Sequence, residues 1–481
     1  MNKLYLGDCL DILRNELEIK PESVDLIYID PPFNSKRNYN VFFDDKEIQT
    51  QRVAFEDTWS LHSVGNYLTE LDTIHHDKLL DLLKAYQHIA PQVFPYLVMM
   101  TLRIIELHKV LKPTGSFYLH CDPTASHYLK TVCDAVFGAK NFKNEIIWEY
   151  RTGGVPKNGF AKKHDIILFY SKTKEIIFQT QFERTYIPTL ANRKFAKEEL
   201  GAEIDDIGCP TCAQKGQWCK KSVMRDVWFV QPLFRNSRER LGYPTQKPKA
   251  LLERIIKASS NEGDIILDAF CGCGTTIDTA ESLNRQWIGI DIAPFAVSLI
   301  KRRLQDTYGD DLSKFEVRGT PTDEPSAIKL WEQNPFAFED WWLTELEVFA
   351  TTYGKKGPDK GIDGIGQYLI PKVEKSVKVA FQVKGGKVES KDIDALMGVV
   401  ALDKYDMGVL LTRHKPTKPM LQKVAQAGQF EAAYGYKYPK IQIMTLAEFF
   451  VGKQLSLPKD NITFKSAATV GKGGKQKGLF E

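Results

Sequence analysis

Two hydrogen-bond acceptors and an aromatic ring stand together at Asp30-Pro31-Pro32-Phe33, directly after an apolar segment. The Asp30 carboxylate and the Pro31 carbonyl can accept both hydrogens of an aromatic amino group, which turns its lone pair toward an electrophile. Pro31 and Pro32 stiffen the loop, and Phe33 offers a flat face to a base rotated out of a duplex. Because Asp-Pro-Pro is also an ordinary surface turn, the motif alone leaves both interpretations open.

A second loop, from Asp268 through Phe270, Gly272 and Gly274, follows an expected strand and precedes an expected helix. Its glycines allow close backbone approach to a ligand, as the amino-acid end of S-adenosylmethionine requires. Asp291 ends the next expected strand, where a carboxylate can bind both ribose hydroxyls. A dinucleotide site is the alternative, although the Phe-x-Gly-x-Gly spacing favours the methyl donor over it.

Short apolar runs alternate with helical stretches around both loops, which indicates α/β architecture. Ligands of such sheets bind beyond the carboxyl ends of strands, so we expect the two loops at neighbouring strand ends. The predicted organisation is a catalytic half at 1–150, a basic, weakly periodic recognition region at 151–242, a cofactor half at 243–318, a linker at 319–333, a second α/β domain at 334–455 and a flexible tail at 456–481.

Charge is distributed unevenly along the 481 residues. The whole chain carries +4, but residues 151–249 hold 19 Lys and Arg against 10 Asp and Glu, a local +9. A basic middle region suits a phosphate backbone, although many solvated surfaces are rich in lysine. We find no signal peptide and no run of the roughly 18 apolar residues that a membrane span needs, and eight cysteines indicate no disulfide scaffold. These features predict a cytoplasmic protein without a membrane partner.

The two loops together resemble the amino-methyltransferases of DNA, in the β arrangement in which the catalytic loop precedes the cofactor loop. The resemblance covers residues 1–307, and its matching segments are 4–8, 30–33, 115–122, 164–170 and 243–248. It implies a Rossmann-like sheet that binds S-adenosylmethionine, with an inserted recognition region. Family members with Asp in the tetrapeptide mostly methylate adenine N6, and those with Ser mostly cytosine N4.

This resemblance also implies individual roles. Asp8 is expected near the adenine of the cofactor, and Thr245 and Lys247 belong to a turn that covers its methionine part. The implied partner is double-stranded DNA, and such enzymes commonly form homodimers. Within the recognition region, the candidate contacts to phosphate or guanine are Arg235, Arg238 and Arg240. The alternative activity is methylation of cytosine N4.

The second domain resembles the Mrr-like branch of the PD-(D/E)xK nucleases over residues 336–450. Asp363 precedes an expected strand, and Gln382 and Lys384 share one face of the next. Asp363 and Gln382 would bind Mg²⁺ while Lys384 supports an attacking water. Accessory acids are expected at Glu339 and Glu347. Most nucleases carry Glu or Asp at the position of Gln382, so a domain that only binds DNA remains the alternative, and a wholly non-catalytic nucleic-acid binder is a third class.

Two weaker patterns complete the predictions. Cys209, Cys212 and Cys219 supply three of the four ligands of a structural zinc site, although incidental cysteines give the same pattern. In the tail, the sequence resembles a sliding-clamp peptide at Gln476, Leu479 and Phe480.

Overall fold

A computed structural model gives the fold. It describes residues 1–32, 38–45, 48–56, 61–73, 76–150, 156–187, 218–234, 237, 239–241, 243, 245–350, 362–370, 376–402, 405–458 and 460–461. In this part of the chain, no helix is long and apolar enough to cross a membrane.

A nine-stranded sheet forms the larger unit, with the strand order β10-β6-β7-β5-β2-β11-β12-β1-β13. Only β7 runs antiparallel to its neighbours; the other strands of this sheet are mutually parallel. The strands are β1 (Asn2–Leu6), β2 (Val24–Ile29), β5 (Leu111–Cys121), β6 (Phe142–Glu149), β7 (His164–Ser171), β10 (Val227–Phe229), β11 (Ile265–Asp268), β12 (Gln286–Asp291) and β13 (Phe315–Arg318).

Helices cover both faces of this sheet, which explains why β2 is apolar at nearly every position. Ile27 and Ile29 face one core with α1, α3, α4 and α5, whereas Leu26 and Tyr28 face a second core with α8, α9 and α10. The helices are α1 (Cys9–Arg14), α2 (Leu61–Thr73), α3 (Asp77–Ile89), α4 (Phe94–Val110), α5 (Ser126–Cys133), α8 (Lys249–Ser259), α9 (Thr275–Ser282) and α10 (Pro294–Tyr308). The unit is therefore a Rossmann-like α/β fold, as the sequence predicts.

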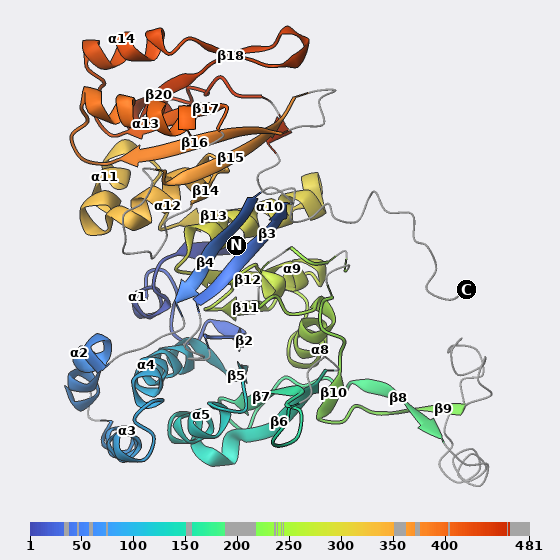
Figure 1. Cartoon of the computed structure of the whole chain (residues 1–481). Helices are drawn as coiled ribbons and strands as arrows, with labels where there is room; N and C mark the ends of the chain where they lie inside the picture. The colour runs from blue at the N-terminus through green and yellow to red at the C-terminus, as the bar shows by residue number, and fades with distance from the viewer. Residues whose placement is uncertain are drawn as a thin grey trace.

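The predicted recognition region contributes to the core sheet as well as to an insertion. β7 and β10 both lie in the nine-stranded sheet. The part of the chain that is inserted into this sheet therefore does not begin at residue 151. Between them the described chain forms an antiparallel hairpin of β8 (Phe182–Ile187) and β9 (Trp218–Val223), which projects from the unit in Figure 1. A second hairpin pairs β3 (Asn38–Asp45) with β4 (Ile48–Glu56).

The C-terminal unit is a smaller α/β domain, coloured from yellow to red in Figure 1. Its sheet has the order β14-β15-β16-β17-β20, with β21 on β15, and contains β14 (Phe349–Ala350), β15 (Gly364–Leu369), β16 (Val377–Lys384), β17 (Met407–Thr412), β20 (Ile441–Thr445) and β21 (Asp460–Asn461). Its helices are α11 (Glu324–Gln333), α12 (Pro335–Glu345), α13 (Ser390–Leu402), α14 (Lys418–Gln426) and α15 (Leu446–Phe450), and a small hairpin joins β18 (Gln429–Glu431) to β19 (Lys437–Pro439).

The joint between the units is structured. α11 lies within the predicted linker and begins at Asp323, whose side chain accepts a hydrogen bond from the Ser326 backbone in a capping box. α12 then packs against α10 of the larger unit. The chain therefore passes between its two units through packed helices.

Candidate active site

Three neighbouring parallel strands end in the predicted chemical groups. β2 pairs with β11 through Ile27 and Leu267, and β11 pairs with β12 through Asp268 and Gly289. Because the strands are parallel, the loop at Asp30, the glycine loop after Asp268 and the carboxylate of Asp291 emerge from the same edge of the sheet. The sequence predicted this placement, and the strand pairing confirms it.

The carboxylate of Asp30 has two oxygens in different surroundings. Oδ2 lies 2.8 Å from the Nζ atom of Lys247, and both side chains are largely buried. Oδ1 is buried and has no hydrogen-bond partner within the described part of the protein. A buried acceptor without a partner is costly unless a ligand supplies a donor, so Oδ1 is suited to an incoming N–H group. Phe33 lies outside the described residues.

A buried chain of hydrogen bonds lies beside Asp30. The Tyr28 hydroxyl is 2.8 Å from Nδ1 of His120, His120 Nε2 is 3.2 Å from Asp165 Oδ2, and the Tyr150 hydroxyl donates to Asp165 Oδ1 at 3.1 Å. Burial tends to raise the pKa of Asp165, but the hydrogen bond and charge of His120 and the charge of Lys247 hold it below its usual value. Burial and the charges of Asp30 and Asp268 raise the pKa of Tyr28, which keeps its hydroxyl protonated. This network therefore fixes the side chains of β2, β5 and β7 beside Asp30.

The glycine loop depends on backbone conformations that favour glycine. Gly272 has φ +50° and Gly274 has φ +73°, in the left-handed region. A Cβ atom on Gly272 would lie 3.3 Å from the ring of Tyr243, and one on Gly274 would lie 2.6 Å from Cγ1 of Ile300. The turn that contains Tyr243 thus packs directly onto the glycine loop, as its expected role in covering the cofactor requires.

Two carboxylates at the ends of β11 and β12 hold the same loop through hydrogen bonds. Asp268 accepts from the Thr276 hydroxyl at 2.6 Å and the Phe270 backbone at 3.0 Å, and Asp291 accepts from the Gly272 backbone at 2.8 Å. Burial raises the pKa of Asp268 to about 7 and that of Asp291 to about 6. Asp268 is 3% exposed, so it acts through the loop, whereas Asp291 is partly exposed at the strand end.

Asp8 lies one strand further along the same edge. Leu6 at the end of β1 pairs with Asp291, and the Gly7 N–H donates to the Asp291 carbonyl at 2.9 Å. Asp8 begins α1 and accepts two hydrogen bonds from Arg103, at 2.7 and 2.8 Å. The carboxylate remains about one-third exposed, so it is placed to receive a ligand at this edge.

The turn before α8 contains the other two residues predicted to contact the cofactor. Thr245 is half-buried, and Gln246 holds the turn closed by accepting from the Leu241 N–H and donating to the Glu239 carbonyl, each at 2.7 Å. Lys247 reaches Asp30. The turn predicted to cover the methionine part of the cofactor therefore also contacts the Asp30 loop.

Several supporting residues were not predicted. Arg303 donates to the Cys273 carbonyl at 3.1 Å and forms an ion pair with Asp278 at 2.7 Å beneath the glycine loop. His120 and Asp165 lie in the segments 115–122 and 164–170 that match the family, but the sequence assigns neither of them an individual role. Their roles depend on contacts between elements far apart in sequence, so spacing gives little signal.

The C-terminal residues predicted to bind Mg²⁺ lie together without forming a convincing metal site. The Asp363 backbone N–H donates to the Phe381 carbonyl at 2.9 Å, and its Oδ2 atom accepts from the Val383 N–H at 2.7 Å. Gln382 is buried, and its Oε1 atom has no hydrogen-bond partner in the described structure. Asp363 supplies one carboxylate, Gln382 is neutral and Lys384 on β16 is cationic, so these residues leave the charge of a dication uncompensated and do not fit Mg²⁺.

The described residues do not supply the further acids that a metal site at Asp363 needs. Among the described residues, no three His, Cys, Asp or Glu side chains gather closely enough to hold a metal ion. Glu339 lies on α12 and Glu347 precedes β14, and both already have interactions.

Other predicted positions fall mostly outside the described chain. These are Cys209, Cys212, Arg235, Arg238, Gln476, Leu479 and Phe480. Cys219 lies on β9, and Arg240 is described in the turn before α8. Zinc binding, the clamp peptide and the homodimer therefore stay predictions.

A family model described as DNA methylase matches residues 24–302, more than half of the chain, and the protein belongs to this family. A second model, described as NACHT-associated inactive Restriction Endonuclease 1, matches residues 337–450. The first match spans the described edge with Asp30, the glycine loop and Asp291, and the second spans the smaller sheet.

Curated relatives cover most of the larger unit. The type II methyltransferase M.HpaI of Haemophilus parainfluenzae is 26% identical over 346 residues, which is 72% of this chain and 87% of that protein. The DNA adenine methyltransferase YhdJ of Escherichia coli (strain K12) is 28% identical over 321 residues, 65% of this chain and 87% of the relative.

Solved structures give weaker likenesses. The cytosine-N4-specific PvuII DNA methyltransferase has a TM-score of 0.39 at 16% identity and covers 64% of this chain and 88% of its own. The M1.HpyAVI–SAM complex has a TM-score of 0.34 at 19% identity and covers 63% and 99%. These two likenesses add nothing to the family assignment.

Proposed function

We propose that this protein transfers a methyl group from S-adenosylmethionine to the N6 amino group of adenine in double-stranded DNA. The observation that carries the proposal is the buried Oδ1 atom of Asp30, which lacks a partner among the described residues, at the sheet edge next to the glycine loop. Membership of the DNA methylase family and the aspartate of the tetrapeptide support the choice.

The donors and acceptors at this edge fit S-adenosylmethionine. Gly272 and Gly274 let the backbone approach its amino-acid end, Asp291 can accept from its ribose hydroxyls, and Asp8 and Thr245 border the same edge. When bound, the sulfonium supplies an electrophilic methyl group. The names of the M1.HpyAVI–SAM complex and of the relative YhdJ agree with this cofactor and with adenine as the target.

The chain's own residues prepare the amino group. Its lone pair is delocalised into the purine ring, so it is a weak nucleophile until both N–H bonds are held by acceptors. Asp30 Oδ1 and the Pro31 carbonyl accept these bonds and direct the lone pair toward the cofactor side. Lys247 holds Oδ2, which leaves Oδ1 aimed at the base, and the Asp30 carboxylate can take the proton that the methylated nitrogen releases.

The modified nucleoside tests this proposal directly. Purified protein is incubated with unmethylated genomic DNA and labelled S-adenosylmethionine, and the digested nucleosides are separated by mass spectrometry. N6-methyladenine in the wild type and no label with Asp30→Ala are expected. N4-methylcytosine as the labelled product would contradict the proposal and would support its alternative, methylation of cytosine N4, which is the specificity of the PvuII DNA methyltransferase.

We further propose that the C-terminal domain does not cut DNA. Among the described residues no three His, Cys, Asp or Glu side chains form a metal-binding group, and Asp363 is engaged with the backbone of β16. The description of the matching family model as inactive agrees with this view. These residues therefore support a domain that does not cleave DNA.

A further inference from the structure

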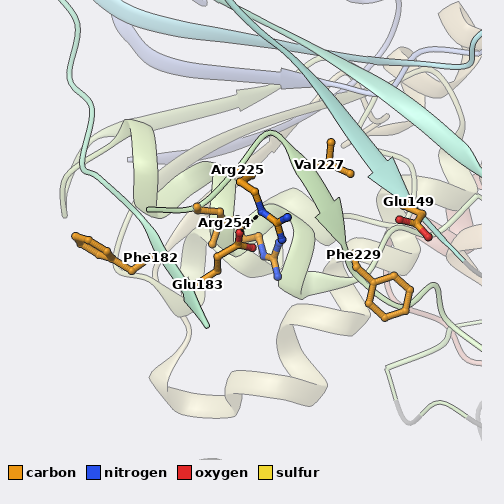
Figure 2. A pocket seen from close by; sticks show the side chains of 8 residues that line it. Glu149, Phe182, Glu183, Arg225, Val227, Phe229 and Arg254 are labelled. Atoms are coloured by element: carbon orange, nitrogen blue, oxygen red, sulfur yellow. Dashed lines mark hydrogen bonds and ion pairs between the residues drawn. The ribbon is translucent and has the colours of Figure 1, made fainter. Parts of the chain in front are cut away.

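A pocket of about 500 Å³ lies at the outer edge of the large sheet, away from Asp30. β10, the last strand on this side, forms one wall, α8 another, and the base of the β8–β9 hairpin a third (Figure 2). The residues that line it are Glu149, Phe182, Glu183, Met224, Arg225, Val227, Phe229 and Arg254. Its size falls within the range of small-ligand sites.

Exposed aromatic rings are concentrated around this pocket. Phe182 and Phe229 are each about half exposed, and Phe178 and Phe234, from the same stretch of chain, are also exposed. Burying such rings is favourable, so four of them within 178–234 indicate a surface that something covers. Their planar faces suit the π-face of a nucleobase, which every base presents.

Two arginines converge on the same space, as Figure 2 shows. Arg225 forms an ion pair with Glu183, with 2.6 Å between Nε and Oε1. The guanidinium of Arg254 lies 5.7 Å from the centre of the Trp228 ring, and it makes no ion pair with any described carboxylate. Burial lowers the pKa of Arg254 and the charge of Glu183 only partly offsets this effect, so the guanidinium is poorly solvated and would gain from a further anion.

One end of the pocket lies at the same edge of the sheet as Asp30. Glu149 ends β6 and pairs with Phe229, and β6 runs parallel to β2 because β7, between β5 and β6, is antiparallel to both. Three strand spacings separate β6 from β2, which is about 14 Å at ~4.8 Å per spacing. This distance corresponds to roughly four nucleotides along one DNA strand. A strand held at Asp30 can therefore reach the pocket.

We propose that this pocket binds an unstacked nucleotide of the DNA substrate, with its phosphate on Arg225 and Arg254 and its base against Phe229. The proposal rests on DNA as the substrate and names the contact surface of the region between β7 and α8. Glu183 competes with the phosphate for Arg225, so it weakens binding in the wild type. Because Glu183 is paired with Arg225, removing the Glu183 carboxylate should free Arg225 for the phosphate and strengthen binding.

Fluorescein-labelled oligo(dT) of 12 residues and a random-sequence duplex are the probes, and anisotropy gives their affinities for the full chain. Phe229→Ala is expected to weaken oligo(dT) binding about tenfold through lost stacking. Arg225→Ala should reduce the slope of log K against log salt by about 0.7, the value for one phosphate of a single strand. Glu183→Gln should bind more tightly than the wild type, which misfolding cannot mimic.

The matched control is Phe336→Ala, because Phe336 is an exposed phenylalanine in the C-terminal unit, and it should leave both affinities unchanged. Unchanged oligo(dT) binding by Phe229→Ala, or weaker binding by Glu183→Gln, overturns the proposal. Weaker binding of the duplex alone also overturns it, because the contact is then with the outside of the helix. Asp30→Ala separates the two proposals, since it should abolish methylation while retaining oligo(dT) binding.

Discussion

At the scale of single residues, the ion pair between Lys247 and Asp30 links the two halves of the site. Lys247 belongs to the turn that packs on the glycine loop, and Asp30 belongs to the loop that we propose to face the base. One side chain therefore sets the position of the proposed catalytic carboxylate relative to the glycine loop. We expect Lys247 to act as a positioning residue, through Asp30.

Replacing Lys247 by Met should lower kcat about 100-fold with little change in the KM for DNA, because a displaced carboxylate no longer holds the amino group in line. Lys247→Arg should restore part of kcat, since it keeps the charge. The control is Lys257→Met, an exposed lysine of α8 whose ion pair with Glu253 lies away from the edge. A KM effect without a kcat effect would contradict this role.

Asp268 predicts a measurable dependence of stability on pH. Its pKa is about 7 in the folded protein, against an ordinary value of 3.8. The folded state therefore retains the proton between about pH 4 and 7 while the unfolded state loses it, so this group's contribution to stability is present below pH 4 and declines as the pH rises to 7. The loss reflects the burial of its charged form.

Asp268→Asn should remove this dependence. Urea unfolding of the two proteins is compared at pH 5 and pH 8, and the variant should be more stable relative to the wild type at pH 8 than at pH 5. A stability difference that does not change between the two pH values would show that Asp268 titrates as an ordinary carboxyl group in the folded protein.

At the scale of elements, the start of α9 is determined by one close approach. Gly274 precedes the helix in the left-handed region, and Ile300 of α10 occupies the space where a Cβ atom would lie. Gly263 has a similar φ of +85°, but a Cβ atom added there would meet no other atom within 4 Å among the described residues. The two glycines thus share a left-handed backbone conformation and differ in packing.

Gly274→Ala and Gly263→Ala should each lose about 1 kcal/mol of unfolding free energy from the left-handed conformation. Gly274→Ala should lose a further ~1–3 kcal/mol from overpacking and should also bind S-adenosylmethionine more weakly. Calorimetric titration and urea unfolding measure the two effects. Equal losses in both variants, with equal cofactor affinity, would show that α10 adjusts freely.

The sequence predicted the loops of the site more completely than their supports. The Asp30 loop and the glycine loop can each be predicted from a short stretch of sequence, because each follows an apolar strand and contains residues with special backbone or acceptor properties. The pairing of Lys247 with Asp30 and the Tyr28–His120–Asp165 chain arise only when three or four strands are placed side by side. Local sequence patterns do not specify the order of the strands in the sheet. The antiparallel strand β7, which lies within the basic region, made this order harder to predict.

The C-terminal domain shows the same limit. Alternation along β16 correctly predicted that residues 382 and 384 face one way, and the smaller α/β sheet was expected. The hydrogen bond from the Val383 backbone to Asp363 depends on where β15 begins and how it pairs with β16, which residue spacing does not specify. The charge that a metal would meet could therefore be judged only with the fold in view.

At the scale of the whole molecule, the two units give separable readouts. Supercoiled plasmid of unmethylated sequence should remain uncut with Mg²⁺ or Mn²⁺, in the presence or absence of S-adenosylmethionine, while it becomes methylated when the cofactor is supplied. Lys384→Ala should behave identically, and Asp30→Ala should lose methylation only. Nicking or linear product that disappears with Lys384→Ala would show instead that the domain is an active nuclease.

The order of strands also determines when this enzyme can first work during its synthesis. Asp25 of β2 receives the backbone N–H of Ile265 across 240 residues of chain, and β1 is held between β12 and β13. The earliest strands to leave the ribosome thus wait for some of the last strands of the larger unit. A nascent chain therefore contains Asp30 long before the glycine loop and the strand that ends at Asp291 can be placed beside it.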